Sequence, residues 1–136
     1  MNEILLASTP SSLIYLSSFQ NKLVVKKKIT GISSLASIQS EAAAHSILSS
    51  HPHVVDFIRL GLPLDFISID PHGVLTLEYC PSNLLDFLNS RLKDRLDERQ
   101  VIDISRQIAS GLAHIHSFKL WHRDIKIENI HSHLYY

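Results

Sequence analysis

The stretch His122-Arg123-Asp124-Ile125-Lys126-Ile127-Glu128-Asn129 is dense in charged and polar side chains and follows a long segment of helical periodicity. Apolar residues in that segment recur on one helical face, which predicts a helix over 97–118. Asp97 and Glu98 would lie at its beginning, where the helix dipole favours negative charge. A His-Arg-Asp triplet alone would fit an ordinary polar turn after a helix. Lys126 and Asn129 follow the triplet within the same stretch.

The sequence before this helix predicts a sheet followed by helices. Short β-branched or aromatic runs separated by turns predict strands, and an alanine-rich segment of helical spacing predicts a helix after the third strand. The predicted strands are 3–7, 13–16, 22–26, 54–60 and 74–79, and the predicted helices are 34–50, 84–91 and 97–118. This order predicts an α+β fold in which the first three strands form an antiparallel meander.

The composition is that of an ordinary globular domain. The chain has 136 residues, of which 45% are hydrophobic and 19% charged, and this length suits one domain. The 13 basic and 13 acidic residues cancel, so no long-range field favours nucleic acid or an anionic membrane. The sequence has a single cysteine, no basic leader and no apolar run of roughly 20 residues. We therefore expect a soluble intracellular protein, with the cytoplasm as its default location.

The stretch from His122 to Asn129 resembles the catalytic loop of protein kinases, H-R-D-x-K-x-x-N. The resemblance implies that Asp124 accepts or orients the proton of the attacking hydroxyl and that Lys126 offsets charge on the transferred phosphoryl group. It also implies that Asn129 is a ligand of Mg²⁺. A lysine two residues after the aspartate is typical of the Ser/Thr class, although the proline that usually follows is Ile127 here.

A second resemblance lies in the third predicted strand. Leu23-Val24-Val25-Lys26 resembles the V-A-I-K motif, whose lysine holds the α- and β-phosphates of ATP. The resemblance implies an ion pair between Lys26 and Glu41 on the first helix. His51-Pro52-His53-Val54-Val55, further along, is similar to the family's H-P-x-[IV]-V exit from that helix. Two unrelated surface charges would be the alternative for Lys26 and Glu41.

The third resemblance is to the segment that joins the two kinase lobes. Leu75-Thr76-Leu77-Glu78-Tyr79-Cys80 is similar to the strand that enters this hinge, with Leu77 at the gatekeeper position. Backbone groups of Glu78 and Cys80 would then bind the adenine. A plain buried strand followed by a helix would describe the same residues without a ligand.

Two features depart from the family pattern. The segment 7–12 stands where kinases carry G-x-G-x-x-G, and its Pro10 lacks an N–H donor, so we expect a weaker grip on phosphate. The printed sequence ends at Tyr136, before a D-F-G motif. We therefore expect a kinase domain truncated after the catalytic loop, with the N-lobe and hinge in 1–80 and the start of the C-lobe in 81–136. The N-lobe would hold a five-stranded antiparallel sheet and one helix.

The resemblance to protein kinases, together with these departures, leaves two functional hypotheses open. The resemblance implies a kinase that binds MgATP and transfers the γ-phosphoryl group to a serine or threonine of a protein. The absent motifs favour a non-catalytic pseudokinase, or a remnant that acts as a binding module. The expected partners are a nucleotide and a protein substrate, with neither nucleic acid nor membrane. An unrelated small α+β domain is a third, weaker interpretation.

Overall fold

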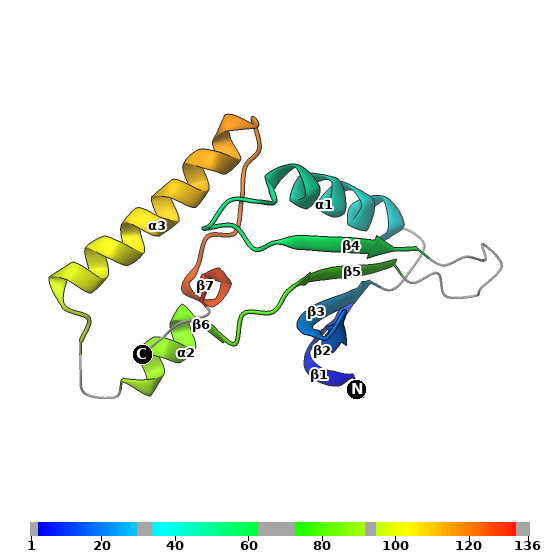
Figure 1. The fold of residues 1–136 in the computed structure, drawn as a ribbon, viewed down its shortest axis with the longest axis horizontal. Helices are drawn as coiled ribbons and strands as arrows, with labels where there is room; N and C mark the ends of the chain where they lie inside the picture. Colours follow the sequence, from blue (N-terminus) through cyan, green and yellow to red (C-terminus); the bar gives the residue numbers. More distant parts are fainter. Residues whose placement is uncertain (1–2, 30–33, 63–72, 92–94, 133–136) are drawn as a thin grey trace. The chain divides into compact units, whose positions relative to one another are not determined.

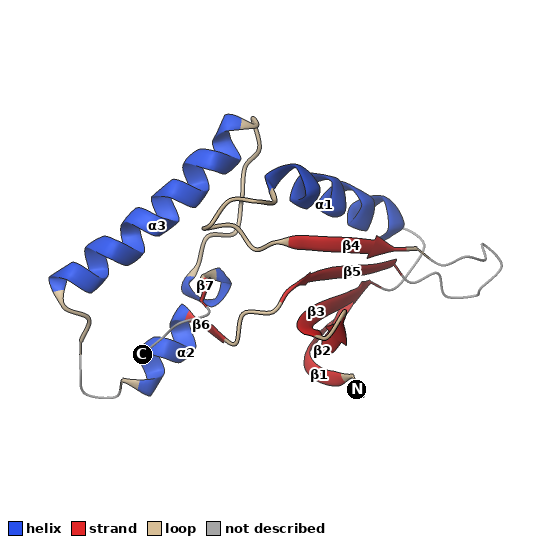
Figure 2. Ribbon diagram, viewed as in Figure 1, coloured by secondary structure: helices blue, strands red, loops and turns tan. Residues whose placement is uncertain are grey.

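The computed structural model describes residues 3–29, 34–62, 73–91 and 95–132. Its fold is α+β, with most strands preceding the two later helices (Figures 1 and 2). The strands are β1 (Ile4–Thr9), β2 (Ser12–Phe19), β3 (Lys22–Ile29), β4 (Phe57–Gly61), β5 (Gly73–Glu78), β6 (Ser82–Asn83) and β7 (His131–Ser132). The helices are α1 (Ser34–Leu48), α2 (Leu84–Ser90), α3 (Glu98–Ser117) and the 3₁₀ turn η1 (Ile127–Asn129).

The first five strands form one antiparallel sheet in the order β1-β2-β3-β5-β4. This confirms the predicted five-stranded sheet. A two-residue turn joins β2 to β3, and both of its residues, Gln20 and Asn21, have positive φ angles of 49° and 63°. Such a turn matches the twist of neighbouring strands. The register that follows pairs Tyr15 with Lys26 and Ile14 with Lys27.

Helix α1 covers one face of this sheet, beside β4 and β5 (Figure 1). The core between them consists of Ile29, Ile38, Ala42 and Leu75, all buried. Gly73 permits the close approach of the helix, because a Cβ there would lie 2.8 Å from Cγ2 of Ile38. The cluster therefore fixes which face of the sheet points to α1.

A second compact unit contains 51–54 and the chain from residue 80, while the first contains 1–50 and 55–79. In the second unit, α3 begins with a capping box, in which the Asp97 side chain accepts from the N–H of Gln100 and the Gln100 side chain from that of Asp97. Gly111 of α3 packs against the 51–54 segment, since a Cβ there would lie 2.6 Å from the His53 carbonyl oxygen. The assignment of 1–80 and 81–136 to kinase lobes stays a prediction, and 133–136 lie outside the described residues.

Several element ends differ from the prediction. Strand β3 continues to Ile29 because its ladder with β5 extends as far as Gly73. Helix α1 ends at Leu48, since Ser50 adopts a φ angle of 76° that a helix cannot contain. Strand β4 begins only at Phe57, because the N–H of Val54 is used in a turn by the His51 carbonyl.

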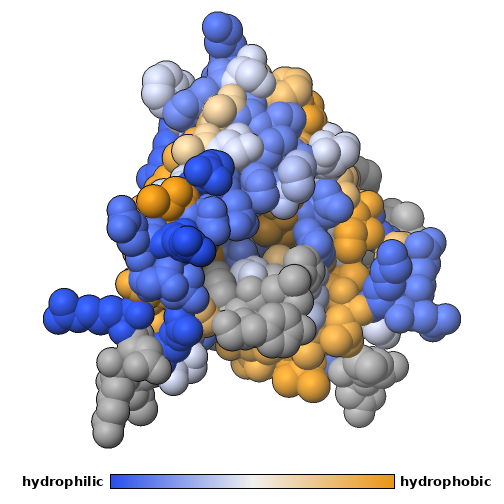
Figure 3. Space-filling model, turned by 60° about the vertical axis from the view of Figure 1, so that its left-hand side comes forward, coloured by the Kyte–Doolittle hydropathy of each residue, from blue (hydrophilic) through white to orange (hydrophobic). Residues whose placement is uncertain are grey.

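Many apolar side chains of the second unit reach the surface. Val101, Ile102 and Phe118 are each more than 40% exposed, and Trp121 is 71% exposed. Figure 3 shows hydrophobic residues (orange) exposed between hydrophilic ones (blue) on one face of the molecule. No helix in the described parts of the chain is long and apolar enough to cross a membrane.

Candidate active site

The loop that contains Asp124 is held at both ends within the second unit. Before it, α3 ends at Ser117, and Lys119 takes a left-handed φ of 61° that turns the chain out of the helix. After it, η1 leads to Ile130, whose carbonyl accepts a 2.7 Å hydrogen bond from the N–H of Leu84 at the beginning of α2. Strand β7 then pairs with β6. These anchors fix a short, exposed loop against two helices.

Within the loop, the three predicted side chains meet. Nζ of Lys126 lies 3.0 Å from Oδ2 of Asp124. The side-chain amide of Asn129 donates to the same Oδ2 at 2.8 Å and to the Asp124 carbonyl oxygen at 2.9 Å. The hydrogen bond from Lys126, followed by that from Asn129, holds the pKa of the Asp124 carboxyl below its usual range. Asp124 is therefore a carboxylate at neutral pH, and both donors bond its Oδ2.

The first two residues of the motif shape the backbone. The N–H of Asp124 donates to Nδ1 of His122 at 3.3 Å, which requires that this ring nitrogen carry no proton. Arg123 adopts a φ of 65°, which is uncommon for a residue with a side chain. Such backbone strain persists where surrounding contacts over-determine the conformation, and it is frequent at active sites.

The loop also fits part of a Mg²⁺ site. Asn129 uses its amide N–H groups on Asp124, which leaves its carbonyl oxygen as the group that could ligate a cation. Among the residues that the structure describes, no group of three His, Cys, Asp or Glu side chains could hold a metal. Mg²⁺ usually takes one or two protein oxygens and completes its shell with phosphate and water. The donors of this loop match that partial set.

The second cluster lies on the sheet, where the structure corrects the predicted lysine. Nζ of Lys27 lies 2.9 Å from both carboxylate oxygens of Glu41. Lys26 instead bonds Glu3, also at 2.9 Å. The predicted ion pair between Lys26 and Glu41 is therefore wrong, and its lysine partner is the next residue along β3.

Strand alternation explains the correction. Successive side chains of a strand point to opposite faces, so a shift of one residue moves a side chain to the other face. Ile29 belongs to the core against α1, which places Lys27, two residues earlier, on the α1 face and Lys26 on the opposite face. The sequence carries one indication of this, the apolar Ile29 two residues after Lys27, but the burial of Ile29 is known only from the fold. The run of three consecutive lysines, 26–28, made the choice among them ambiguous from sequence.

The predicted hinge residues divide between the two units. Leu77 packs against the core on the α1 face, opposite Val25 in the ladder. The N–H of Glu78 donates to the Asp56 carbonyl at 3.0 Å, and the Glu78 carboxylate accepts from the N–H of Asp56. The backbone N–H of Glu78 is therefore already used in a hydrogen bond within the protein. Cys80 is half-buried and is the first residue of the longer segment of the second unit, and its adenine-binding role stays a prediction.

Comparison with known proteins identifies the family. The family model described as "Protein kinase domain" matches residues 16–133. The chain belongs to the protein kinase family.

Individual kinases match parts of the chain. The actin-regulating kinase PRK1 of Saccharomyces cerevisiae is 34% identical over 99 residues, which cover 71% of this chain and 12% of that kinase. Wee1-like protein kinase 2 of Sus scrofa is 33% identical over 107 residues, covering 76% of this chain and 18% of the relative. The chain thus spans less than a fifth of the length of these kinases. The predicted family and fold class are both confirmed.

The hairpin between β1 and β2 contains the segment 7–12, whose place at the glycine-rich loop of kinases stays a prediction. The backbone N–H of Ser12 donates to Oγ1 of Thr9 at 3.0 Å, and the two hydroxyl oxygens lie 2.8 Å apart. Pro10, at the tip, has no N–H to offer. The turn is therefore closed by its own side chains, and fewer backbone donors remain for a phosphate than in a glycine-rich loop.

Proposed function

We propose that this kinase chain binds ATP through Lys27 and contributes Asp124, Lys126 and Asn129 to phosphoryl transfer onto a protein serine or threonine. The observation that carries the proposal is the two-oxygen contact between Lys27 and Glu41 on the α1 face. An ammonium group held by a carboxylate has a defined position from which it can meet an incoming phosphate. Lys26, which was the sequence-based candidate, faces away from α1 and is not part of this proposal.

The electrostatics of the Lys27–Glu41 pair suit phosphate binding. Both side chains retain 29% exposure, so the ammonium can keep its contact with Glu41 and still reach a ligand. A partly exposed ion pair contributes little to stability, about 0–1 kcal/mol. Its value would therefore lie in positioning the charge of Lys27. Glu41 holds that charge from a helix, which is a more rigid support than a loop.

The residues of the loop support the catalytic part of the proposal. Asp124, held as a carboxylate by Lys126 and Asn129, can accept the proton of a serine or threonine hydroxyl. The charge of Lys126 would lie close to the oxygen that attacks the phosphoryl group. Bound Mg²⁺ would neutralise charge on the nucleotide phosphates. Preference for serine or threonine rests on the lysine two residues after Asp124, which is typical of that class.

A non-catalytic binding module is the second candidate, and the closed turn at Thr9 and Ser12 favours it. Phosphoryl transfer depends mostly on positioning and charge neutralisation. A turn whose Ser12 N–H already bonds Thr9 would position the phosphates less firmly. In that case the chain would bind nucleotide or a protein without turning over ATP.

The test of nucleotide binding compares two neighbouring lysines. Lys27→Met and Lys26→Met each remove one charge from β3 and keep most of the side-chain length. We expect wild type and Lys26→Met to bind MgATP with similar affinity, and Lys27→Met to bind at least about tenfold more weakly, which is about 1.4 kcal/mol. Isothermal titration calorimetry and ATP-dependent thermal stabilisation measure this. Equal weakening by both variants would contradict the assignment of Lys27.

Catalysis is tested separately from binding. Transfer of labelled phosphate from ATP to a serine-rich peptide should disappear in Asp124→Asn, while ATP binding remains. ATP binding by the wild type without any transfer would remove the catalytic part of the proposal and leave the binding module. Transfer that persists in Asp124→Asn would remove Asp124 from its proposed role.

A further inference from the structure

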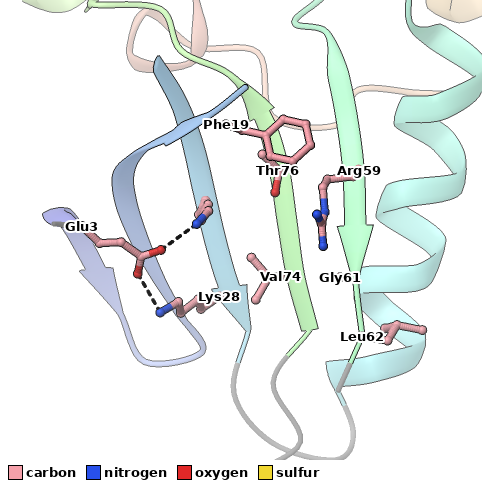
Figure 4. Close-up of a pocket in the computed structure, with 9 residues that line it drawn as sticks. Glu3, Phe19, Lys28, Arg59, Gly61, Leu62, Val74 and Thr76 are labelled. Carbon is pink, nitrogen blue, oxygen red and sulfur yellow. Dashed lines mark hydrogen bonds and ion pairs between the residues drawn. The ribbon is translucent and has the colours of Figure 1, made fainter. Parts of the chain in front are cut away.

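The face of the sheet opposite α1 carries a groove that does not include Lys27, the lysine proposed to bind ATP. It has a volume of about 350 Å³ and is lined by residues of the β1 end and of β2, β3, β4 and β5 (Figure 4). Its polar lining consists of three cations, one carboxylate and one hydroxyl, and its apolar walls are Phe19, Leu62 and Val74. We call it the outer groove; its charged members are Glu3, Lys26, Lys28 and Arg59.

An acidic side chain of the chain itself already lies in this groove. Glu3 bonds Lys26 through Oε1 and Lys28 through Oε2, both at 2.9 Å. These two hydrogen bonds, with that from Lys26 the larger, hold the pKa of the Glu3 carboxyl below its usual range. Lys28 is further positioned by the ring of Tyr15, 4.7 Å from its Nζ. The groove thus already binds one anionic side chain, the carboxylate of Glu3.

The third cation of the groove, Arg59, is not bonded to Glu3. Arg59 extends from β4 on the other side of the groove from Glu3 (Figure 4), with its guanidinium 5.4 Å from the centre of the Phe19 ring. Within the described parts of the chain it has no carboxylate partner. Its planar fork suits the oxygens of a phosphate. One carboxylate against three cations leaves the groove with a surplus of positive charge.

We propose that the outer groove binds a phosphorylated peptide, whose phosphate replaces Glu3 on Lys26 and Lys28 and also reaches Arg59. A phosphorylated side chain carries about −1.5 to −2 charges and three acceptor oxygens, so it can engage more of these donors than one carboxylate. The apolar walls would accept side chains that flank the phosphate. A peptide is favoured over a lipid surface, because the present occupant is itself a peptide side chain in a concave site. The inference does not depend on ATP binding at Lys27, which lies on the opposite face.

The test uses the full 136-residue chain and a short fluorescein-labelled peptide with one phosphoserine between alanine and leucine residues. Fluorescence anisotropy should show saturable binding that weakens with added salt and is absent for the same peptide with serine. Arg59→Met and Lys28→Met should each weaken binding about tenfold, as expected when a hydrogen bond to a charged group is lost. Arg106→Met, which removes an exposed charge from α3, is the matched control and should bind like wild type.

Glu3→Gln should change the affinity for the phosphopeptide in the opposite direction. Removing the competing carboxylate should tighten binding of the phosphopeptide several-fold, and this variant alters only a partly exposed side chain near the first residues of the chain. Unchanged or weaker binding in Glu3→Gln would overturn the proposal. It would also be overturned if the chain bound vesicles of phosphatidylcholine and phosphatidylserine in an Arg59-dependent way but not the phosphopeptide. Lys27→Met should leave phosphopeptide binding intact, which separates this result from the test of ATP binding.

Discussion

The two faces of the five-stranded sheet are built differently, although β3 contributes lysines to both. On the α1 face, Lys27 pairs with a glutamate of a helix and lies beside the buried core of Ile29 and Ile38. On the other face, Lys26 and Lys28 share a single glutamate at the edge of an open groove. Because successive side chains of a strand point to opposite faces, neighbouring lysines of β3 bond different partners. Each prediction below tests that difference.

The largest effect is expected where α1 covers the sheet. Ile38 is fully buried, so Ile38→Ala leaves a cavity and should lower the free energy of unfolding by about 2–5 kcal/mol. Val74, on the groove face, is only half-buried, and Val74→Ala should cost about 1 kcal/mol. Urea denaturation of both variants measures the difference. Equal losses would mean that the two faces are equally well packed.

A smaller effect is expected from two glycines at the same end of the sheet. Gly73→Ala places a Cβ 2.8 Å from the Ile38 side chain, and such crowding should cost about 1–3 kcal/mol. Gly61 faces the groove, where a Cβ would lie 3.6 Å from the nearest atom, Nη2 of Arg59. Gly61→Ala should change stability by no more than about 0.5 kcal/mol. Comparable melting temperatures for both variants would contradict the close contact of α1 at Gly73.

The contacts within the loop from His122 to Asn129 could be predicted from sequence because its side chains lie close together along the chain. Asp124, Lys126 and Asn129 belong to one continuous stretch, and their mutual contacts need only a tight loop. The long helix before it was equally predictable, because its apolar residues recur on one face; the structure adds a local capping box of Asp97 and Gln100 at its beginning. Features of this kind depend on short-range spacing, which a sequence displays directly.

The ion pair between Lys27 of β3 and Glu41 of α1 could be predicted only in part. Glu41 does pair with a lysine of β3, but the choice among three consecutive lysines required the register of β3 against β5 and the position of Ile29 in the core. That information comes from residues far apart in the sequence. The same limit applies to the outer groove, whose Glu3 and Arg59 are far apart in the sequence and line one groove only in the folded chain.

A still smaller effect should separate the two ion pairs. Lys27 and Glu41 each bond no other charged group in the described residues, whereas Glu3 keeps Lys28 when Lys26 is removed. Double-mutant cycles should therefore give a coupling of about 0.5–1 kcal/mol for Lys27 with Glu41 and a value near zero for Lys26 with Glu3. Denaturation of the single and double methionine and glutamine variants measures both. A larger coupling for Lys26 would mean that Lys28 does not compensate.

The smallest expected effect is a dependence of stability on pH that arises from the groove face. Lys26 and Lys28 lower the pKa of Glu3 in the folded chain, so Glu3 contributes stability above its unfolded pKa of about 4.3. This contribution is lost as the pH falls from that value through the lowered folded pKa, because the unfolded state then binds more protons. Glu3→Gln should therefore flatten the decline in unfolding midpoint below about pH 4.3 and leave its shape near neutral pH unchanged. A decline that is identical in wild type and Glu3→Gln would show that the carboxylate is not held by the lysines in solution, and the anion site of the outer groove would lose its main support.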